Sequence, residues 1–357
     1  LARGLQLICL ANGMRIAHLS EPSTVVETLS VLRPTFLVVV PRVLERIQAA
    51  AAQKAEAAHL TRLWRAAVAT AVSGGRAAEQ STDGRAPASV RQRLFEALFF
   101  RRLRAVMGGR VDYILSGGAR LDPEVSLFFR GIGVPVIEGY GLTETTAPLT
   151  GNLPGDIRAG TVGRPLPGST VRIGEDGEIL AKGIGVFRGY RDPAHDADAF
   201  VDGFFRTGDL GRFDADGRLI IEGRSKDVIV TSTGKTVVPA PWEFAVETDP
   251  LVSHAVMVGE GRSYLSALIV LDPEEVARQG DAPVAGQLRE IADEGLRARI
   301  QRSVDAANAL VSRSEQVRRF TLIAADLADT TIVTPTLKIK RRVLLERGSD
   351  VVAALYR

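Results

Sequence analysis

Apolar and polar positions over residues 1–159 alternate between a strand pattern and a helical one. Thr35–Val40 is a continuous β-branched and apolar run, typical of a strand that is covered on both faces. Pro41 follows at a position that suits the first turn of a helix. Two further strands are predicted at Asp112–Leu115 and Val134–Glu138, with helices before each of them. Strands and helices that alternate in this way predict a parallel α/β sheet.

The helices of this portion are predicted from three- and four-residue apolar spacing. Residues 43–80 have a helical pattern, with one apolar face formed by Leu60, Leu63, Trp64, Ala67 and Val68. Asp122-Pro123-Glu124 predicts a capped helix start, and that helix should run to about Arg130. The remaining predictions are a helix at the extreme N-terminus that stops at Asn12-Gly13, a strand at Arg15–His18, a helix over Pro22–Arg33, a polar loop over 73–90 and a helix to about Met107.

From about Gly160 the pattern changes to short strands separated by tight turns. Asp176-Gly177 and Asp216-Gly217 have hairpin-turn chemistry. The predicted strands here are Val171–Ile173, Glu178–Lys182 and Leu219–Glu222. Beyond the charged break Gly223–Asp227, strands are predicted at Val228–Thr231, Ser253–Gly259, Ala267–Leu271 and Phe320–Ile323, and a helix from about Ala285 to Val311. The predicted organisation is a partial α/β portion over residues 1–159, an antiparallel β subdomain over 160–225 and an α+β domain over 226–357.

Composition narrows the class of protein. A length of 357 residues predicts two or more domains, and a hydrophobic content of 45% is enough for sizeable cores. The 45 basic and 42 acidic residues give a net charge of +3, which is too even a balance to predict a nucleic-acid partner. No apolar run has the length of a membrane span. The single cysteine, Cys9, excludes a disulfide within the chain and fits a reducing, cytoplasmic location. The N-terminal stretch LARGLQLICLANGM lacks a small-residue cleavage site, so we expect no signal peptide and a start inside a larger protein.

The stretch Gly139–Thr146, GYGLTETT, carries the richest candidate chemistry. It follows a predicted strand, and its glycines leave backbone N–H groups accessible to a phosphate. The hydroxyls of Thr143 and Thr145 can donate hydrogen bonds, Glu144 can hold a hard cation, and the Tyr140 ring offers a face to a planar base. The alternative is a threonine-rich turn that satisfies its own backbone.

A second glycine-rich loop follows the preceding predicted strand, at Ser116-Gly117-Gly118-Ala119. Ligands of open α/β sheets collect at such carboxyl ends of strands. Three later loops complete the set of motifs: Arg206–Leu210 (RTGDL), Gly223–Asp227 (GRSKD) and Thr334–Arg342 (TPTLKIKRR). Taken singly, these are a capped turn, a solvated turn and a basic patch. Their order and separation are more specific than any one of them.

In that order the four motifs GYGLTETT, TGDL, GRSKD and TPTLKIKRR resemble the adenylate-forming enzymes, which comprise acyl-CoA synthetases, luciferases and the adenylation domains of peptide synthetases. The resemblance covers essentially the whole chain. It implies the C-terminal part of a large adenylation domain, with a parallel α/β sheet and a small antiparallel β subdomain, followed by a small mobile α+β domain. It also implies ATP or AMP as the nucleotide and Mg²⁺ as the metal.

The resemblance assigns roles to individual residues. Thr143 and Glu144 would hold the AMP phosphate and magnesium, with Tyr140 beside the adenine and Gly141 among the nucleotide-binding residues. Gly117, Gly118 and Ala119 would line the adenine pocket. Asp209 and Arg224 would reach the ribose, and Lys226 would be the hinge residue. Lys338, in PTLKI, would be the catalytic lysine that drives adenylation. Lys340, Arg341 and Arg342 are interpreted as surface charge.

The phrases LSGGARLDPEVSLFFRGIGVPVIEGYGLTET and VTSTGKTVVPAPWE narrow the resemblance to the bacterial long-chain fatty acyl-CoA synthetases. In those enzymes a glycine-containing loop, matched here by Gly234 and Lys235, lies along the tunnel of CoA. The implied reaction joins a fatty acid to ATP, giving acyl-AMP and pyrophosphate, and CoA then displaces AMP. The implied partners are therefore small molecules: fatty acid, ATP and CoA. Contact with a membrane surface stays open.

One family element does not occur in the sequence. The Ser/Thr/Gly-rich loop ending in Pro-Lys-Gly, which binds the β- and γ-phosphates, is not among the 357 residues. We therefore expect that this chain alone does not adenylate fatty acids. Two alternatives stay open: a non-catalytic AMP-binding fragment, and a fatty acyl-AMP ligase whose acceptor is a carrier protein.

Overall fold

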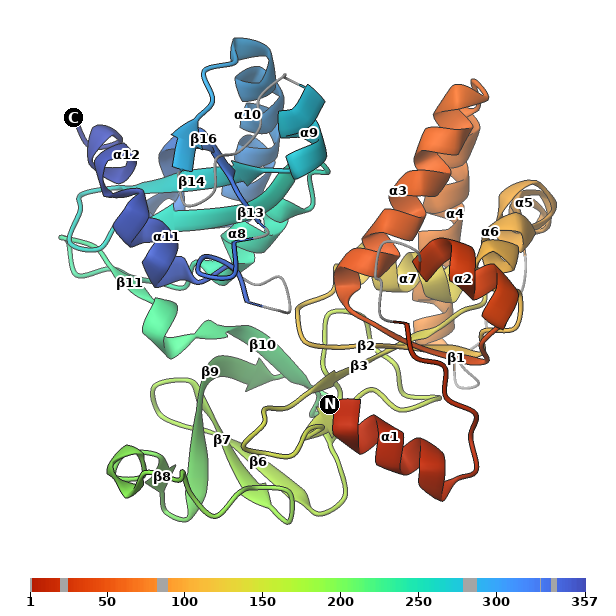
Figure 1. Ribbon diagram of the computed structural model, residues 1–357, viewed down its shortest axis with the longest axis horizontal. Coiled ribbons are helices and arrows are strands. Elements are labelled where there is room, and N and C mark those ends of the chain that lie inside the picture. The colour runs from red at the N-terminus through yellow and green to blue at the C-terminus, as the bar shows by residue number, and fades with distance from the viewer. Residues whose placement is uncertain (1, 20–24, 82–88, 279–287, 328, 335–338) are drawn as a thin grey trace. The chain divides into compact units, whose positions relative to one another are not determined.

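The computed structural model describes residues 2–19, 25–81, 89–278, 288–327, 329–334 and 339–357. Contacts divide the chain into two units: Leu1–Thr207 with Gly211–Ile221, and Gly208–Leu210 with Glu222–Arg357. The first unit holds a five-stranded sheet of order β1-β2-β3-β4-β5 (Figure 1). Its strands are β1 (Phe36–Val39), β2 (Tyr113–Ser116), β3 (Val136–Tyr140), β4 (Thr150–Gly151) and β5 (Arg164–Pro165). The first three strands are parallel, as the alternation of strands and helices predicted.

Helices cover the parallel strands and bury the first core (Figure 1). They are α2 (Val25–Leu32), α3 (Pro41–Ala57), α4 (Thr61–Gln80), α5 (Val90–Phe95), α6 (Arg101–Val106) and α7 (Pro123–Gly131), with a π-helical turn over Glu96–Phe100. Helix α1 (Ala2–Ala11) precedes them in the chain and exposes Leu7, Ile8 and Leu10. Trp64 of α4 packs edge-on against Phe128 of α7, with 6.0 Å between ring centroids. The predicted cap of α7 is confirmed, because the Asp122 carboxylate accepts from the backbone N–H of Glu124.

Helices α4 and α7 approach closely enough to require glycine. A Cβ on Gly75 would lie 2.1 Å from the Leu127 carbonyl oxygen, and one on Gly131 would lie 1.9 Å from the Ala71 carbonyl oxygen. Since no side chain fits at such distances, the backbones of the two helices touch directly. This contact fixes α7, the helix that leads into β3.

The helical character predicted for residues 43–80 is confirmed, in two helices, α3 and α4, between which His59 takes a φ of 56°. Other predictions for this unit were wrong. Leu63 is exposed on a face that was predicted to be apolar and buried. Arg15–His18 has no regular structure, and residues 73–80 belong to α4 rather than to a loop. Part of the helix predicted at Pro22–Arg33 falls on residues 22–24, which lie outside the described residues.

The second sheet has the order β10-β9-β7-β6, with β8 paired to β9 (Figure 1). Its strands are β6 (Ser169–Ile173), β7 (Glu178–Gly183), β8 (Phe200–Val201), β9 (Phe204–Phe213) and β10 (Leu219–Arg224). The pairs β6–β7 and β8–β9 are antiparallel, as predicted. A short 3₁₀ turn, Pro193–His195, precedes β8.

The second unit is built on a sheet of order β13-β14-β16-β15. Its elements are β11 (Ile229–Val230), β12 (Thr236–Val237), α8 (Ala240–Glu247), β13 (Val252–Val258), β14 (Leu265–Leu271), α9 (Pro273–Arg278), β15 (Leu288–Glu290), α10 (Glu294–Asn308), β16 (Val317–Ala325), α11 (Arg341–Arg347) and α12 (Ser349–Ala354). All seven residues of β14 are buried, because alternate side chains enter two cores on the two faces of the sheet. The predicted helix from Ala285 to Val311 was too long: α10 begins at Glu294, and β15 precedes it.

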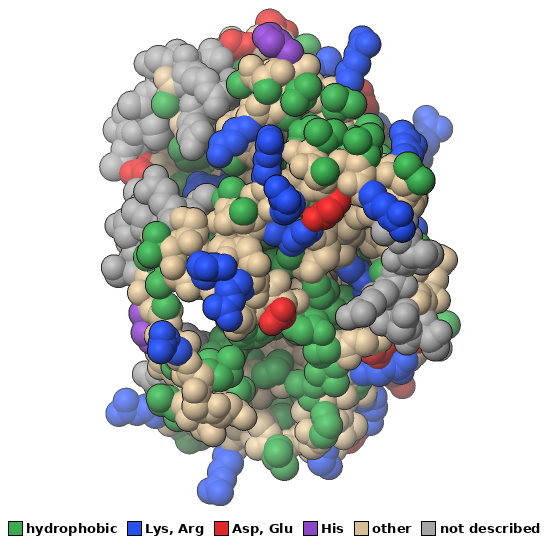
Figure 2. Space-filling view, turned by 90° about the vertical axis from the view of Figure 1, so that its right-hand side faces the viewer, with side chains coloured by type: hydrophobic (Ala, Val, Ile, Leu, Met, Phe, Trp, Pro, Cys, Tyr) green, Lys and Arg blue, Asp and Glu red, His purple; other side chains and the backbone are tan. Residues whose placement is uncertain are grey.

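Figure 2 views the molecule from the side on which α5 and α6 lie in Figure 1, and shows Lys and Arg side chains interspersed with apolar ones. Val90 and Leu94 of α5 are exposed. Among the helices of the described residues, none combines the length and the apolar character needed to cross a membrane.

Candidate functional site

The carboxyl ends of β2 and β3 bring together the two glycine-rich loops of the first unit. Ser116 and Glu138 are register partners in these parallel strands, so the segments that follow them leave the same edge of the sheet. Gly117, Gly118 and Ala119 follow β2, and Gly118 takes a φ of 86° that favours glycine. Tyr140 ends β3, and its side chain is half-buried. The structure thus places the predicted adenine loop next to the predicted phosphate loop.

The loop after β3 closes on itself through Thr145. The Thr145 hydroxyl accepts from the backbone N–H of Leu142 at 2.9 Å and donates to the Leu142 carbonyl at 3.2 Å. Gly141 is required, because a Cβ there would lie 2.9 Å from the Cα of Ala147. The prediction that Thr145 offers its hydroxyl to a ligand was therefore wrong, since this buried side chain satisfies its own turn.

Thr143 and Glu144 are the polar side chains that this loop presents. Thr143 is exposed, and the described part of the chain offers no hydrogen-bond partner to its hydroxyl. The Glu144 carboxylate oxygen Oε1 accepts a hydrogen bond from the Tyr190 hydroxyl at 3.1 Å. The described residues contain no group of three or more His, Cys, Asp or Glu side chains that could hold a metal ion. One carboxylate fits Mg²⁺, which proteins usually bind through one or two carboxylates together with substrate phosphates.

Glu138 is a polar residue of this edge that the sequence reasoning did not select. Its side chain is buried, and its Oε1 has no hydrogen-bond partner among the described residues. The neighbouring Ser116 hydroxyl is likewise buried without a partner in the described chain. Burial raises the pKa of Glu138 to about 8, against the opposing effect of Arg120, so the carboxyl is largely neutral at pH 7. The sequence did contain a signal for Glu138: it is an acidic residue inside the apolar run that ends in GYG, and an acid that is buried in a strand is a candidate functional residue.

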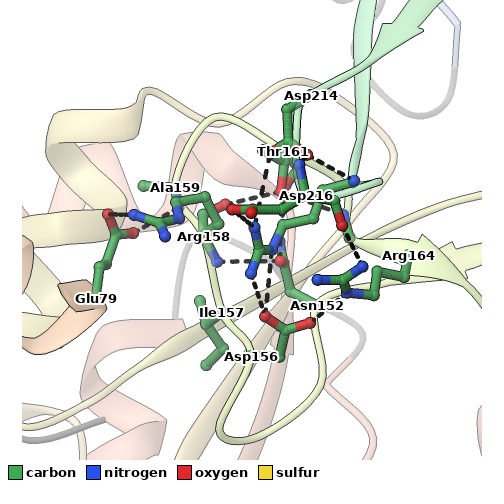
Figure 3. A network of polar contacts seen from close by, with 12 residues as sticks. Glu79, Asn152, Asp156, Ile157, Arg158, Ala159, Thr161, Arg164, Asp214 and Asp216 are labelled. Atoms are coloured by element: carbon green, nitrogen blue, oxygen red, sulfur yellow. Dashed lines mark hydrogen bonds and ion pairs between the residues drawn. The ribbon is translucent and has the colours of Figure 1, made fainter. Parts of the chain in front are cut away.

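A polar network supports the segment after β4, which borders β3 (Figure 3). Asn152 donates from its backbone N–H to the Glu138 carbonyl, and its side-chain amide donates to the Thr161 carbonyl at 2.7 Å. The carboxylate of Asp156 binds the guanidinium groups of Arg164 and Arg218, the latter largely buried. Because a buried arginine is paired here with several acids, the network fixes this segment beside the candidate site.

In the second unit, the structure joins the two residues predicted to reach a ribose. Asp209 is buried, and its Oδ1 pairs with Nε of Arg224 at 3.0 Å. Gly208 takes a φ of 69°, and its carbonyl accepts from the Ser225 hydroxyl at 3.1 Å. The motifs RTGDL and GRSKD therefore meet, although a whole hairpin separates them in sequence.

The remaining predicted residues of this unit lie on turns. Lys226 is exposed in a 3₁₀ turn, Ser225–Asp227. Gly234 takes a φ of 78° between β11 and β12, and the amine of Lys235 pairs with Glu315 Oε1 at 3.3 Å. Lys338 lies outside the described residues.

The interpretation of Arg341 as surface charge was wrong. Its guanidinium pairs with the Glu243 carboxylate at 2.7 Å and also donates to the Met257 carbonyl. Glu243 is half-buried, and it accepts in addition from the backbone N–H of Met257 at 2.6 Å. Arg342 is exposed, as predicted, and the exposed Lys340 donates to the Thr330 carbonyl at 2.9 Å. The pair of Arg341 and Glu243 thus ties the start of α11 to α8 and β13.

Comparison with known families identifies both parts of the chain. Residues 2–191 match the family model described as AMP-binding enzyme. Residues 226–357 match the model described as AMP-binding enzyme C-terminal domain. All residues that the resemblance assigned to the phosphate and adenine loops fall in the first match, and Lys226 opens the second.

Curated relatives agree with this match. The chain is 38% identical over 362 residues to the long-chain-fatty-acid–CoA ligase FadD15 of Mycobacterium tuberculosis, covering 100% of this chain and 60% of the relative. It is 31% identical over 367 residues to the long-chain-fatty-acid–CoA ligase ACSBG1 of Mus musculus, covering 93% of this chain and 50% of the relative. The chain therefore spans about half to three-fifths of the length of these relatives.

Solved structures share the fold. The A-PCP didomain of a carboxylic acid reductase from Segniliparus rugosus, in complex with AMP, superposes with a TM-score of 0.67 at 25% identity, covering 96% of this chain and 44% of that one. The adenylation domain of a carboxylate reductase from Mycobacterium chelonae gives a TM-score of 0.66 at 24% identity, covering 95% and 49%. The predicted fold class is thereby confirmed as that of an adenylation domain. The chain belongs to the family of AMP-binding enzymes.

Proposed function

We propose that the chain is the nucleotide-binding and C-terminal part of a long-chain fatty acid–CoA ligase. The observation that carries the proposal is the loop after β3, which presents Thr143 and Glu144 at the carboxyl edge of the sheet. The names of the relatives FadD15 and ACSBG1 supply the substrate class.

The residues of the first unit would bind the AMP moiety. The exposed hydroxyl of Thr143 can donate to a phosphate oxygen, and the open backbone around Gly118 leaves space for the base. Glu138 adds a buried neutral carboxyl, which can both donate and accept a hydrogen bond. Such a group suits a ligand edge that carries a donor beside an acceptor, as adenine does.

The acidic and basic residues would have different roles in balancing the charges of the reactants. A carboxylate and an α-phosphate repel each other, so adenylation needs cations at both. Magnesium, when bound through Glu144, would neutralise phosphate charge. Lys338 would stabilise the charge that develops in the transition state, and Asp209, paired with Arg224, would accept from the ribose hydroxyls.

Calorimetric titration of AMP into the purified chain in the presence of Mg²⁺ tests the binding proposal. We expect saturable binding that Thr143→Ala weakens by about tenfold or more, since a charge-assisted hydrogen bond contributes about 1.5–3 kcal/mol. Thr248→Ala is the matched control, because that hydroxyl bonds the Ala245 carbonyl in the other unit. Equal affinities of wild type and Thr143→Ala would rule out the proposed phosphate role.

The chemistry is a separate question, because the sequence has no Ser/Thr/Gly-rich loop ending in Pro-Lys-Gly. We expect the chain of 357 residues to bind AMP without catalysing ATP–pyrophosphate exchange with oleate. Robust exchange would contradict this expectation and assign the β- and γ-phosphates to other residues.

The acceptor of the acyl group is proposed to be CoA, with Gly234 and Lys235 beside its pantetheine. A carrier protein is the second candidate, because one structural neighbour is the A-PCP didomain of a carboxylic acid reductase. Product release from preformed acyl-AMP separates them: CoA-dependent release supports the first, and release that requires a carrier protein supports the second.

A further inference from the structure

Tyr190 makes a hydrogen bond to Glu144 that none of the sequence motifs predicted. Its hydroxyl donates to Oε1 of Glu144 at 3.1 Å, across 46 positions of the chain. Glu144 belongs to the loop after β3, whereas Tyr190 lies between β7 and the 3₁₀ turn Pro193–His195. The contact therefore joins the candidate metal ligand to a segment that connects strands of the second sheet.

Two further hydrogen bonds hold these segments in place beside each other. The backbone N–H of Phe187 donates to the Glu144 carbonyl at 2.8 Å, and the Thr146 hydroxyl donates to the Gly185 carbonyl at 2.7 Å. A Cβ on Gly185 would lie 2.7 Å from the Thr145 carbonyl oxygen, so glycine permits this approach. The backbone near Tyr190 is thus attached to the backbone near Glu144, independently of the two side chains.

The Tyr190 side chain is itself oriented by neighbours. Its backbone N–H donates to the Asp196 carboxylate at 2.8 Å. Its ring packs edge-on against Phe187, with 4.8 Å between centroids, and edge-on against His195 at 6.2 Å. Phe187 in turn contacts Phe200 and Phe205. Because aromatic contacts restrict the ring, the hydroxyl is held at the carboxylate at a low cost in entropy.

We propose that Tyr190 is a positioning residue, which orients the Glu144 carboxylate toward a divalent cation bound with the nucleotide. The inference rests on the proposed function, because it needs the nucleotide phosphate as a further ligand of the cation. The hydrogen bond to Oε1 restricts the rotation of the Glu144 carboxylate and leaves Oε2 available as a ligand of the cation. Partners of this kind around metal-binding carboxylates typically change metal affinity by about 10- to 100-fold.

The competing interpretation is that Tyr190 only fills the aromatic cluster with Phe187, Phe200 and Phe205. Tyr190→Phe separates the two, because it keeps the ring and removes the hydroxyl alone. A packing role predicts no change in metal affinity for this variant. The positioning role predicts weaker metal binding with unchanged affinity for AMP in the absence of metal.

The measurement is a titration of Mn²⁺, followed by electron paramagnetic resonance, into the full chain saturated with AMP. We expect Tyr190→Phe to weaken Mn²⁺ binding by about tenfold, while metal-free AMP binding stays within about twofold of wild type. Tyr264→Phe is the control, since it removes a hydroxyl that donates to the Leu355 carbonyl in the other unit.

A double-mutant cycle tests whether Tyr190 acts through Glu144. In the background of Glu144→Gln, the additional change Tyr190→Phe should cause no further loss of Mn²⁺ affinity. The inference would be overturned if Tyr190→Phe left the Mn²⁺ affinity unchanged. It would also be overturned if Tyr190→Phe caused the same loss in the Glu144→Gln background as in wild type. In either case AMP binding would still support the proposed function. If wild type fails to bind AMP, the proposed function falls, and the inference falls with it.

Discussion

Glu138 combines a place at the candidate site with a cost in stability. It lies in the middle of β3, two residues before the strand ends at Tyr140, and one of its carboxyl oxygens has no partner among the described residues. Arg120 lowers its pKa and Glu79 raises it, but burial has the largest effect, favours the neutral form and raises the pKa to about 8. An unfolded chain would release this proton near pH 4.5.

The first prediction concerns the pH dependence of stability. Between pH 4.5 and about 8 the folded state retains the Glu138 proton that the unfolded state has lost, so stability falls as pH rises through this range. At about 1.4 kcal/mol per pKa unit, the free energy of unfolding should fall by on the order of 3 kcal/mol between about pH 5 and pH 8. Glu138→Gln should remove this pH dependence. Urea unfolding of both proteins at about pH 5 and pH 8 measures it.

Ser116→Ala serves as the control, because it removes the neighbouring buried hydroxyl without changing any charge. Its free energy of unfolding should keep the wild-type pH dependence. Parallel pH profiles for wild type and Glu138→Gln would show that Glu138 ionises normally in the folded chain.

At the scale of elements, the contact between α4 and α7 sets the position of the candidate site. Gly75 and Gly131 let the two backbones touch, and α7 continues through a short turn into β3. A displacement of α7 would therefore shift the strand that carries Glu138 and Tyr140.

The second prediction compares two adjacent glycines of α4. In Gly75→Ala the new Cβ would meet the Leu127 carbonyl, so we expect a loss of about 3 kcal/mol or more in the free energy of unfolding. In Gly74→Ala the Cβ would lie 3.6 Å from the Gln92 side chain, and the better helix propensity of alanine should stabilise by about 0.5–1 kcal/mol. Urea unfolding measures both, and equal effects would contradict the close helix contact.

The elements differ in how far the sequence could predict them. The start of α7 was predictable because Asp122, Pro123 and Glu124 act within one turn. The break between α3 and α4 was not, since the deciding φ at His59 is a conformation that residues other than glycine seldom adopt.

The candidate functional residues also differ in how far the sequence could predict them. The glycine-rich loops after β2 and β3 were predicted from the sequence, and the resemblance assigned Asp209 and Arg224 to a ribose, but the ion pair between these two residues was not predicted. The contact of Tyr190 with Glu144 and the ion pair of Arg341 with Glu243 join segments that only the folded chain brings together. Sequence spacing carries no signal for such contacts, because neither segment constrains the other until the chain has folded.

At the scale of the whole molecule, the described residues contain separate hydrophobic cores in the two units. The two tryptophans of the chain are divided between them. Trp64 is buried in the first unit, and Trp242 is buried in the second, where its Nε1 donates to the Asn308 side chain at 2.9 Å. Each tryptophan therefore reports on one core.

The third prediction uses these two probes. In Trp242→Phe the fluorescence of Trp64 follows the first unit, and in Trp64→Phe that of Trp242 follows the second. Adding Gly75→Ala should lower the urea midpoint reported by Trp64 and leave that reported by Trp242 nearly unchanged, because distant sites contribute independently. Equal shifts at both probes would show that the two units unfold as one.

The pairing of Asp209 with Arg224 has a consequence for the choice of sugar. The guanidinium already fixes the buried carboxylate, so this acceptor cannot turn toward solvent when a ligand lacks a hydroxyl. A 2′-deoxynucleotide would offer this fixed acceptor one hydroxyl fewer, and sites that hydrogen-bond a substrate hydroxyl reject analogues that lack it most strongly. If the proposed role of Asp209 holds, the rigidity of one ion pair would separate ribonucleotides from deoxyribonucleotides.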